Sequence, residues 1–147
     1  MVDAIVEWSV VNDSVFVFYG DGGEFRGEAL ERWLRELPAS GVRKFIGATG
    51  LDFQLSGDTR KRCNVVLKAQ QIRFVAITDS ALVRGFATAA SWFGITIAAF
   101  PWHDLNDAMS WLELDPKTAL DVMSAVKTNK FTVDQRLTSR KRGLLRV

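Results

Sequence analysis

The fold is decided by residues 72–100, IRFVAITDSALVRGFATAASWFGITIAAF. A short apolar run at each end has the length and composition of a buried strand, and a helix-length segment lies between the two runs. Asp79 or Ser80 supplies a side-chain oxygen that can cap this helix, and Gly94 ends it. Strands joined through a helix are parallel, with a right-handed crossover. The predicted buried side of the helix carries Leu82, Phe86, Ala89, Ala90 and Phe93.

The segments on either side extend this pattern. Residues 4–11 alternate between apolar and polar faces, Asn12-Asp13 supplies a turn, and residues 15–19 are wholly apolar, which predicts a hairpin whose second strand lies deeper in the sheet. Further helices are predicted around residues 28–37, from Asp58, from Asp104 and from Asp115-Pro116, and a further strand over residues 42–49. The expected order is β-β-α-β-α-β-α-β-α, a mixed and mostly parallel five-stranded sheet with helices, followed by one more helix and a basic tail.

Composition is that of one globular domain. The chain has 147 residues, of which 48% are hydrophobic and 24% charged. It lacks an apolar run long enough to cross a bilayer and the pattern of a signal peptide at Met1, so we expect a cytoplasmic protein. Cys63 and His103 are the only residues of their types, which predicts no disulfide, no metal site and no cofactor. We expect a single α/β domain over residues 1–131 and a basic tail over residues 132–147.

Two pieces of the sequence suggest a family. One is FVAITD, residues 74–79, leading into VRGF; the other is IAAF, residues 97–100, leading into a helix that ends DAMSWL. Together with the order of elements from Ala4 to Leu114, they resemble the SpoIIAA-like branch of the STAS superfamily, which includes bacterial anti-sigma-factor antagonists. The resemblance implies a regulatory signalling domain of the STAS kind that binds a protein partner and is not an enzyme.

The resemblance also implies a candidate phospho-switch. In phospho-regulated relatives a Ser or Thr begins the helix after the third strand, and the matching residues here are Asp58 and Thr59, with Ser56 as a second candidate. A phosphate at a helix N-terminus meets free N–H groups and the positive end of the helix dipole. This sequence departs from the family in placing three long cations, residues 60–62, after Thr59 where small residues are usual. The alternative is that Ser56 or Asp58 only caps the helix.

The carboxyl ends of the predicted strands form a second candidate site. In open α/β sheets ligands bind at this edge, and Asp79, Ser80, Trp102 and His103 lie there in the sequence. The alternative function is therefore a carrier of a lipid or another small molecule in this cleft. A hydrolase or transferase is the least favoured class, because no set of nucleophile, base and orienting group can be assembled and Cys63 falls on the predicted inward side of its helix.

The end of the chain is basic. A tail that binds a protein partner, or mediates association of identical subunits, is favoured over one that binds nucleic acid, because the rest of the chain lacks a basic patch and the tail lacks aromatic residues for stacking. Peripheral contact with an anionic membrane remains open, since apolar residues lie among the cations. The candidate cations are Arg136, Arg140, Lys141, Arg142 and Arg146.

Overall fold

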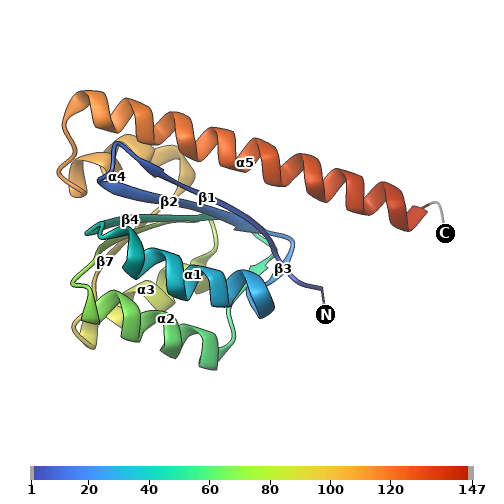
Figure 1. The fold of residues 1–147 in the computed structure, drawn as a ribbon, viewed down its shortest axis with the longest axis horizontal. Helices are drawn as coiled ribbons and strands as arrows, with labels where there is room; N and C mark the ends of the chain where they lie inside the picture. Colours follow the sequence, from blue (N-terminus) through green and yellow to red (C-terminus); the bar gives the residue numbers. More distant parts are fainter. Residues whose placement is uncertain (1, 146–147) are drawn as a thin grey trace.

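The computed structural model, which describes residues 2–145, contains the predicted five-stranded sheet (Figure 1). The strand order is β1-β2-β4-β6-β7. The first two strands are antiparallel and every other neighbouring pair is parallel, so the hairpin and the parallel crossovers are confirmed. The strands are β1 (Ile5–Val11), β2 (Val15–Asp21), β4 (Lys44–Thr49), β6 (Arg73–Ile77) and β7 (Thr96–Phe100).

Helices cover both faces of the sheet (Figure 1). The crossovers from β2 to β4, β6 and β7 all step in one direction, and right-handed connections of this kind place their helices on one face. The remaining helices follow β7 and cover the opposite face. The first group is α1 (Gly27–Ser40), α2 (Gly57–Ala69) and α3 (Ala81–Trp92); the second is a short 3-10 turn, η1 (Trp102–Asp104), then α4 (Leu105–Trp111) and α5 (Pro116–Leu145).

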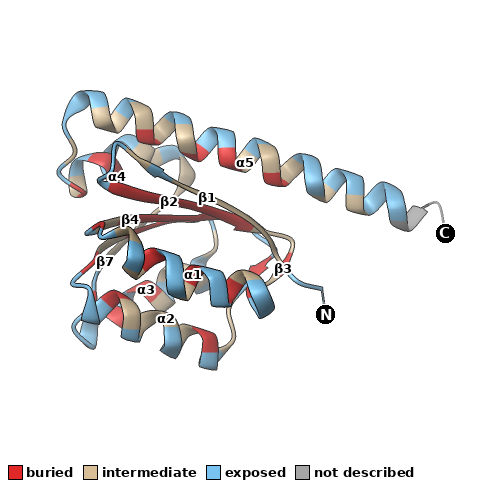
Figure 2. Ribbon diagram, in the orientation of Figure 1, coloured by how far each residue is buried: buried red, intermediate tan, exposed pale blue. Residues whose placement is uncertain are grey.

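Coverage of both faces explains why β2 is buried along its length (Figure 2). Alternate side chains of β2 enter two different cores. On the face of α1–α3 the core is largely aromatic, with the rings of Phe16 and Phe45 stacked 5.6 Å apart between centroids. On the face of α4 and α5 the core is aliphatic, with Val17 and Val126 fully buried. The predicted depth of the second strand is thereby confirmed.

A small second sheet was not predicted. It joins β3 (Gly23–Glu24) in parallel to β5 (Phe53–Gln54), beyond the carboxyl ends of β2 and β4. Gly23 is needed here, because a Cβ atom at this position would collide with the carbonyl oxygen of Val2. The strand propensity of a two-residue segment is too weak to be recognised from sequence.

The expected tail is part of a helix. Helix α5 continues without a break across residues 131–132, contacts the body as far as Arg140, and extends past the sheet in its last turns (Figure 1). The reason is that the buried stripe continues through Val133 and on to Leu137, which packs against Gly22. Leu120, although apolar and at the start of the same helix, lies off this stripe and is exposed.

Helix α3 also differs from its prediction. Ala90 is buried as predicted, together with Ala87, but Leu82 and Phe93, predicted to face inward, are 67% and 75% exposed. The helix packs mainly on β7, the last strand of the sheet, so only a narrow strip of its surface is covered. Hydrophobic spacing identified an apolar helix but could not show how much of it has a neighbour.

Candidate functional site

A groove opens at the carboxyl ends of β4 and β6. One wall is the segment after β4, and the other is the first turns of α3. Its volume is about 350 Å³. Residues 50–57 contribute half of the apolar residues in the lining, and the first turns of α3 contribute the other half. The groove is lined by Leu51, Phe53, Gln54, Leu55, Ser80, Leu82, Val83 and Phe86.

The apolar side chains of the groove differ in their exposure. Phe53 is buried against Phe18 and Phe25, and so connects the groove to the aromatic core. Leu51 and Leu82, in contrast, are 73% and 67% exposed. Two large aliphatic side chains held in water on facing walls of one groove leave apolar surface that a ligand or partner can cover.

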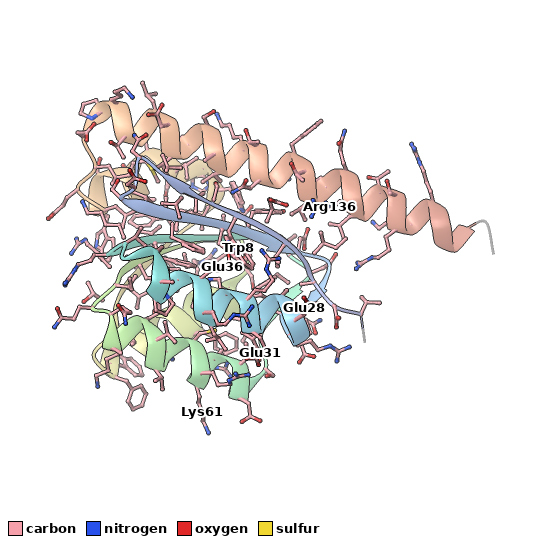
Figure 3. The ribbon with its side chains drawn as sticks, in the orientation of Figure 1. Trp8, Glu28, Glu31, Glu36, Lys61 and Arg136 are labelled. Atoms are coloured by element: carbon pink, nitrogen blue, oxygen red, sulfur yellow. The ribbon has the colours of Figure 1, made fainter. Side chains whose placement is uncertain are left out.

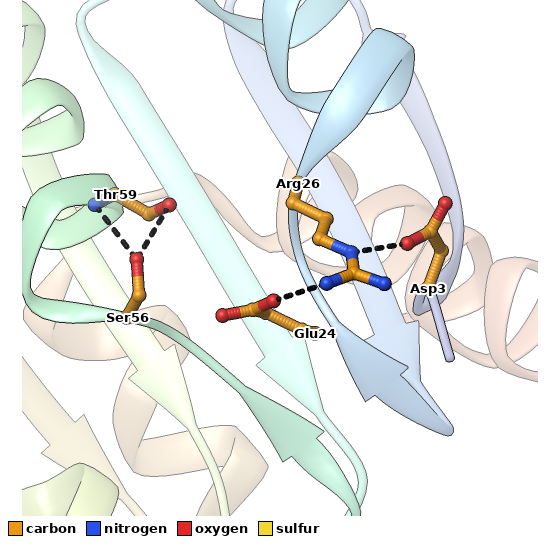
Figure 4. Close-up of polar contacts among 5 residues, drawn as sticks. All are labelled: Asp3, Glu24, Arg26, Ser56 and Thr59. Atoms are coloured by element: carbon orange, nitrogen blue, oxygen red, sulfur yellow. Dashed lines mark hydrogen bonds and ion pairs between the residues drawn. The ribbon is translucent and has the colours of Figure 1, made fainter. Parts of the chain in front are cut away.

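The start of α2 lies beside this groove and contains the candidate phospho-switch. Ser56 is the cap: its Oγ accepts from the backbone N–H of Thr59 at 3.1 Å and donates to Thr59 Oγ1 at 3.0 Å (Figure 4). Thr59 is only 5% exposed, while Ser56 is partly exposed and Asp58 is exposed. The structure therefore brings the three predicted residues together, and it places the most accessible hydroxyl on Ser56.

The cations that follow Thr59 have separate roles. The guanidinium of Arg60 lies 3.9 Å from the centroid of the Phe86 ring, a cation–π contact that ties α2 to the groove wall. Arg62 donates to both carboxylate oxygens of Glu31 on α1, at 2.8 and 3.0 Å, and this pairing holds the pKa of Glu31 below its usual value. Lys61 projects away from the body (Figure 3). Two of the three cations therefore support the helix packing.

The predicted cleft is only partly formed. Ser80 lines the groove and caps α3, where its Oγ accepts from the N–H of Val83 at 3.3 Å. Asp79 instead accepts from the backbone N–H of Trp102 at 3.1 Å. His103 is exposed, and its Nε2 is 3.6 Å from Asp104.

Trp102 has a structural contact at this edge. Its indole N–H donates to the carbonyl oxygen of Thr49 at 3.1 Å, and its ring meets that of Tyr19 edge-to-face at 5.9 Å. These contacts tie the segment after β7 to the ends of β4 and β2. Trp102 thus lies against the sheet, on a different side of the edge from the groove lining.

Cys63 lies among the partly buried residues of the aromatic core. Burial raises the pKa of its thiol to about 12. A thiol with so high a pKa is a poor nucleophile near neutral pH, because the thiolate is the reactive form. Across residues 2–145, no group of three or more His, Cys, Asp and Glu side chains is placed to hold a metal ion, and no helix in that range has the length and hydropathy to span a membrane.

Two of the five candidate cations near the end of the chain contact the body. Arg136, labelled on α5 in Figure 3, pairs with Glu7 of β1 at 3.2 Å by its guanidinium nitrogen. Arg140 donates to the carbonyl oxygens of Asp3 and Gly22 at 3.0 and 2.7 Å. Lys141 and Arg142 are exposed, and Arg146 lies outside the described residues. Binding of a partner by these cations stays a prediction, with Lys141 and Arg142 among the exposed members of the set.

Comparison with known proteins supports the fold alone. No protein-family model matches this chain, and no curated protein matches it. A solved structure does match: an uncharacterised protein of the DUF3478 family from Shewanella loihica PV-4, described as having a SpoIIAA-like fold, with a TM-score of 0.52 and 17% sequence identity. The match covers 75% of this chain and 94% of that protein. The element order, the sheet topology and this likeness together establish that the chain has a SpoIIAA-like fold.

Proposed function

We propose that this chain is a regulatory or scaffold domain that binds a protein partner through the groove between residues 51–55 and the start of α3. The observation that supports this proposal is the pair of exposed leucines, Leu51 and Leu82, on facing walls of one apolar groove. A partner segment that inserts an apolar side chain between them would remove both from water. Such buried apolar anchors contribute most of the energy of many protein interfaces.

A role in binding also agrees with the chemistry of the site. The groove lining contains no acid, base or cysteine among its described residues. Cys63 is held as a neutral thiol by burial, and His103 has only Asp104 beside it. We therefore infer that the chain acts without catalysing a reaction.

If the domain is regulated by phosphorylation, we propose that Ser56 is the residue that carries the phosphate. Its hydroxyl is partly exposed and adjoins Leu55 of the groove, whereas phosphorylation of Thr59 would require a buried side chain to open to solvent. A phosphate adds about two negative charges at neutral pH. At the rim of an apolar groove these charges oppose the burial of an apolar partner side chain, so phosphorylation would weaken docking.

Affinity capture with three forms of the full chain tests the proposal. The forms are wild type, a Leu51→Asp/Leu82→Asp double variant, and Leu120→Asp as a matched control, because Leu120 is a leucine of similar exposure on α5. Quantitative mass spectrometry should find proteins that wild type and the control retain and the double variant loses. Equal recovery of every protein by all three forms would contradict docking at the groove.

The alternative function, a carrier of a lipid or other small molecule, is supported by the same apolar lining. Phe53 at the base of the groove and the volume of about 350 Å³ suit an acyl chain or a small ring. Native mass spectrometry of freshly purified protein separates the two functions. A bound small molecule that is lost in Leu82→Asp would favour the carrier, and a mass equal to that of the chain alone would favour the partner-binding domain.

A further inference from the structure

Arg60 is a cation at the end of the groove that has no anionic partner. Its guanidinium lies 3.9 Å from the centroid of the Phe86 ring on the α3 wall. It also lies beside Gly57, which follows the other wall, since a Cβ atom added to Gly57 would be 3.7 Å from an Nη atom of Arg60. The Nε atom is buried without a hydrogen-bond partner, and no carboxylate of residues 2–145 pairs with this guanidinium. The end of the groove therefore holds a positive charge that the rest of the described chain leaves unpaired.

Other cations near the groove have an acceptor or are solvated by water. Arg62 donates to both carboxylate oxygens of Glu31. Arg84 donates to a backbone carbonyl oxygen at 3.3 Å. Lys61 is exposed and projects away from the body, so water solvates its ammonium group (Figure 3). Arg60 is partly buried, and a charged donor that is removed from water without an acceptor costs free energy that a bound anion would offset.

The contact with Phe86 leaves hydrogen-bond donors of Arg60 available. A guanidinium held against an aromatic ring interacts through its charge and its flat face, while its N–H groups point outward in the guanidinium plane. The spacing of these N–H groups matches the two oxygens of a carboxylate. Because the Nε atom is buried, the terminal Nη groups are the donors that a carboxylate would meet. Arg60 is thus held in place by Phe86 and can still bind a carboxylate.

The surroundings of the groove also favour an anion. Residues 51–86 include six Lys and Arg residues and three Asp residues, and none of these acids belongs to the groove lining. Asp79 accepts from a backbone N–H, and Asp52 and Asp58 are exposed to water. Helices α2 and α3 both begin beside the groove, so the positive ends of two helix dipoles add to the charge of Arg60.

The open shape of the groove suits a segment of a protein. Sites for small ligands bury most of the surface of the ligand. Leu51 and Leu82 are both more than two-thirds exposed, so the groove does not enclose its contents. A partner protein, in contrast, brings its own surface to cover what the groove leaves open. Arginine is also enriched among the residues that contribute most to the affinity of protein interfaces.

We propose that the partner segment carries an acidic residue beside its apolar anchor. The anchor lies between Leu51 and Leu82, and the carboxylate accepts hydrogen bonds from Arg60. This inference rests on the proposed function, because it places a protein segment in the same groove, and it adds the charge that the segment must carry. The Phe86 ring holds the guanidinium at the end of the groove before the partner arrives, so less side-chain entropy is lost on binding.

Panning of a library of random peptides against the full chain tests the proposal. The peptides that bind the groove are those retained by wild type and lost by the Leu51→Asp/Leu82→Asp variant. They should share an Asp or Glu within a few positions of a large apolar residue. Groove-dependent peptides without such an acid would overturn this inference and leave the proposed function standing. A library without groove-dependent peptides would overturn both, and binding of decanoate at the groove would then assign it to a free fatty acid.

A double-mutant cycle on one enriched peptide tests the pairing with Arg60. Replacement of the acid of the peptide by its amide should weaken binding to wild type about ten-fold, as measured by fluorescence anisotropy. Arg60→Met keeps an unbranched apolar side chain against Phe86 and should bind the two peptides equally. Lys61→Met, which loses the same charge at the next residue, should keep the ten-fold difference. A ten-fold difference that persists in Arg60→Met with native circular dichroism would overturn the proposal.

Discussion

The guanidinium of Arg60 on α2 lies over the ring of Phe86 on α3. Since Phe86 lines the groove, this contact joins the helix that begins at the candidate phospho-switch to one wall of the groove. We expect Arg60→Ala to lower the free energy of unfolding by about 1–2 kcal/mol, because a largely desolvated cation–π contact is lost together with the packing of the side chain. Urea unfolding measures the change. Lys61→Ala is the matched control and should change stability little. Equal stability of the two variants would show that the Arg60 contact contributes nothing.

The cap of α2 gives a second prediction. Ser56→Ala removes the oxygen that accepts from Thr59 N–H, and it leaves the buried Thr59 hydroxyl without its donor. We expect a loss of about 1 kcal/mol, typical of an N-cap residue. Hydrogen exchange in the first turn of α2 should become faster. Asp58→Ala serves as the control, since Ser56 provides the side-chain cap. Exchange unchanged in Ser56→Ala would contradict the role of this serine as the cap.

The attachment of the second half of α5 to the body depends on Arg140. Its two hydrogen bonds to the carbonyl oxygens of Asp3 and Gly22 join the helix to the N-terminal segment and to the turn after β2. In Arg140→Ala we expect faster hydrogen exchange over residues 134–145. Exchange over residues 116–130 should change little, because this part of the helix is held by the buried side chains of Val122 and Val126. Arg142→Ala, at an exposed position, should leave exchange as in wild type. Faster exchange in both variants would mean that this half of the helix frays independently of Arg140.

Burial of Cys63 makes stability depend on pH. Desolvation raises the pKa of the folded thiol from 9.0 to about 12, so the neutral form is favoured in the folded state. This contribution is fully present below pH 9 and is lost as pH rises from about 9 toward 12. Between pH 8 and pH 10 wild type should therefore lose about 1 kcal/mol more unfolding free energy than Cys63→Ala. Parallel pH profiles for the two proteins would contradict a buried neutral thiol.

Much of the fold follows from the sequence because its signals are local. The turn at Asn12-Asp13 allowed the hairpin to be predicted, and the cap at Ser80 and the stop at Gly94 allowed the βαβ unit to be predicted. These signals are readable because turn and cap chemistry depends on neighbouring residues. The depth of β2 also followed, because a wholly apolar strand requires cover on both faces. The continuation of α5 was missed because the basic residues after Thr132 obscured the stripe that runs through Val133 and Leu137.

The site was less predictable because it depends on contacts between distant segments. Ser56 and Ser80 were identified through cap chemistry, which is local. The groove itself joins Leu51 and Phe53 to Leu82 and Phe86, and no spacing rule links these residues. A signal was present, since three large apolar residues in the glycine-bounded stretch 50–57 are unusual for a solvent-exposed loop.

Hydrogen exchange of the full chain, with and without a partner recovered by the capture experiment, tests the central claim most directly. Docking at the groove predicts slower exchange in residues 50–57 and 80–86 on binding, with residues 116–131 unchanged. Protection confined to α5, or to any surface away from the groove, would contradict this account of the molecule.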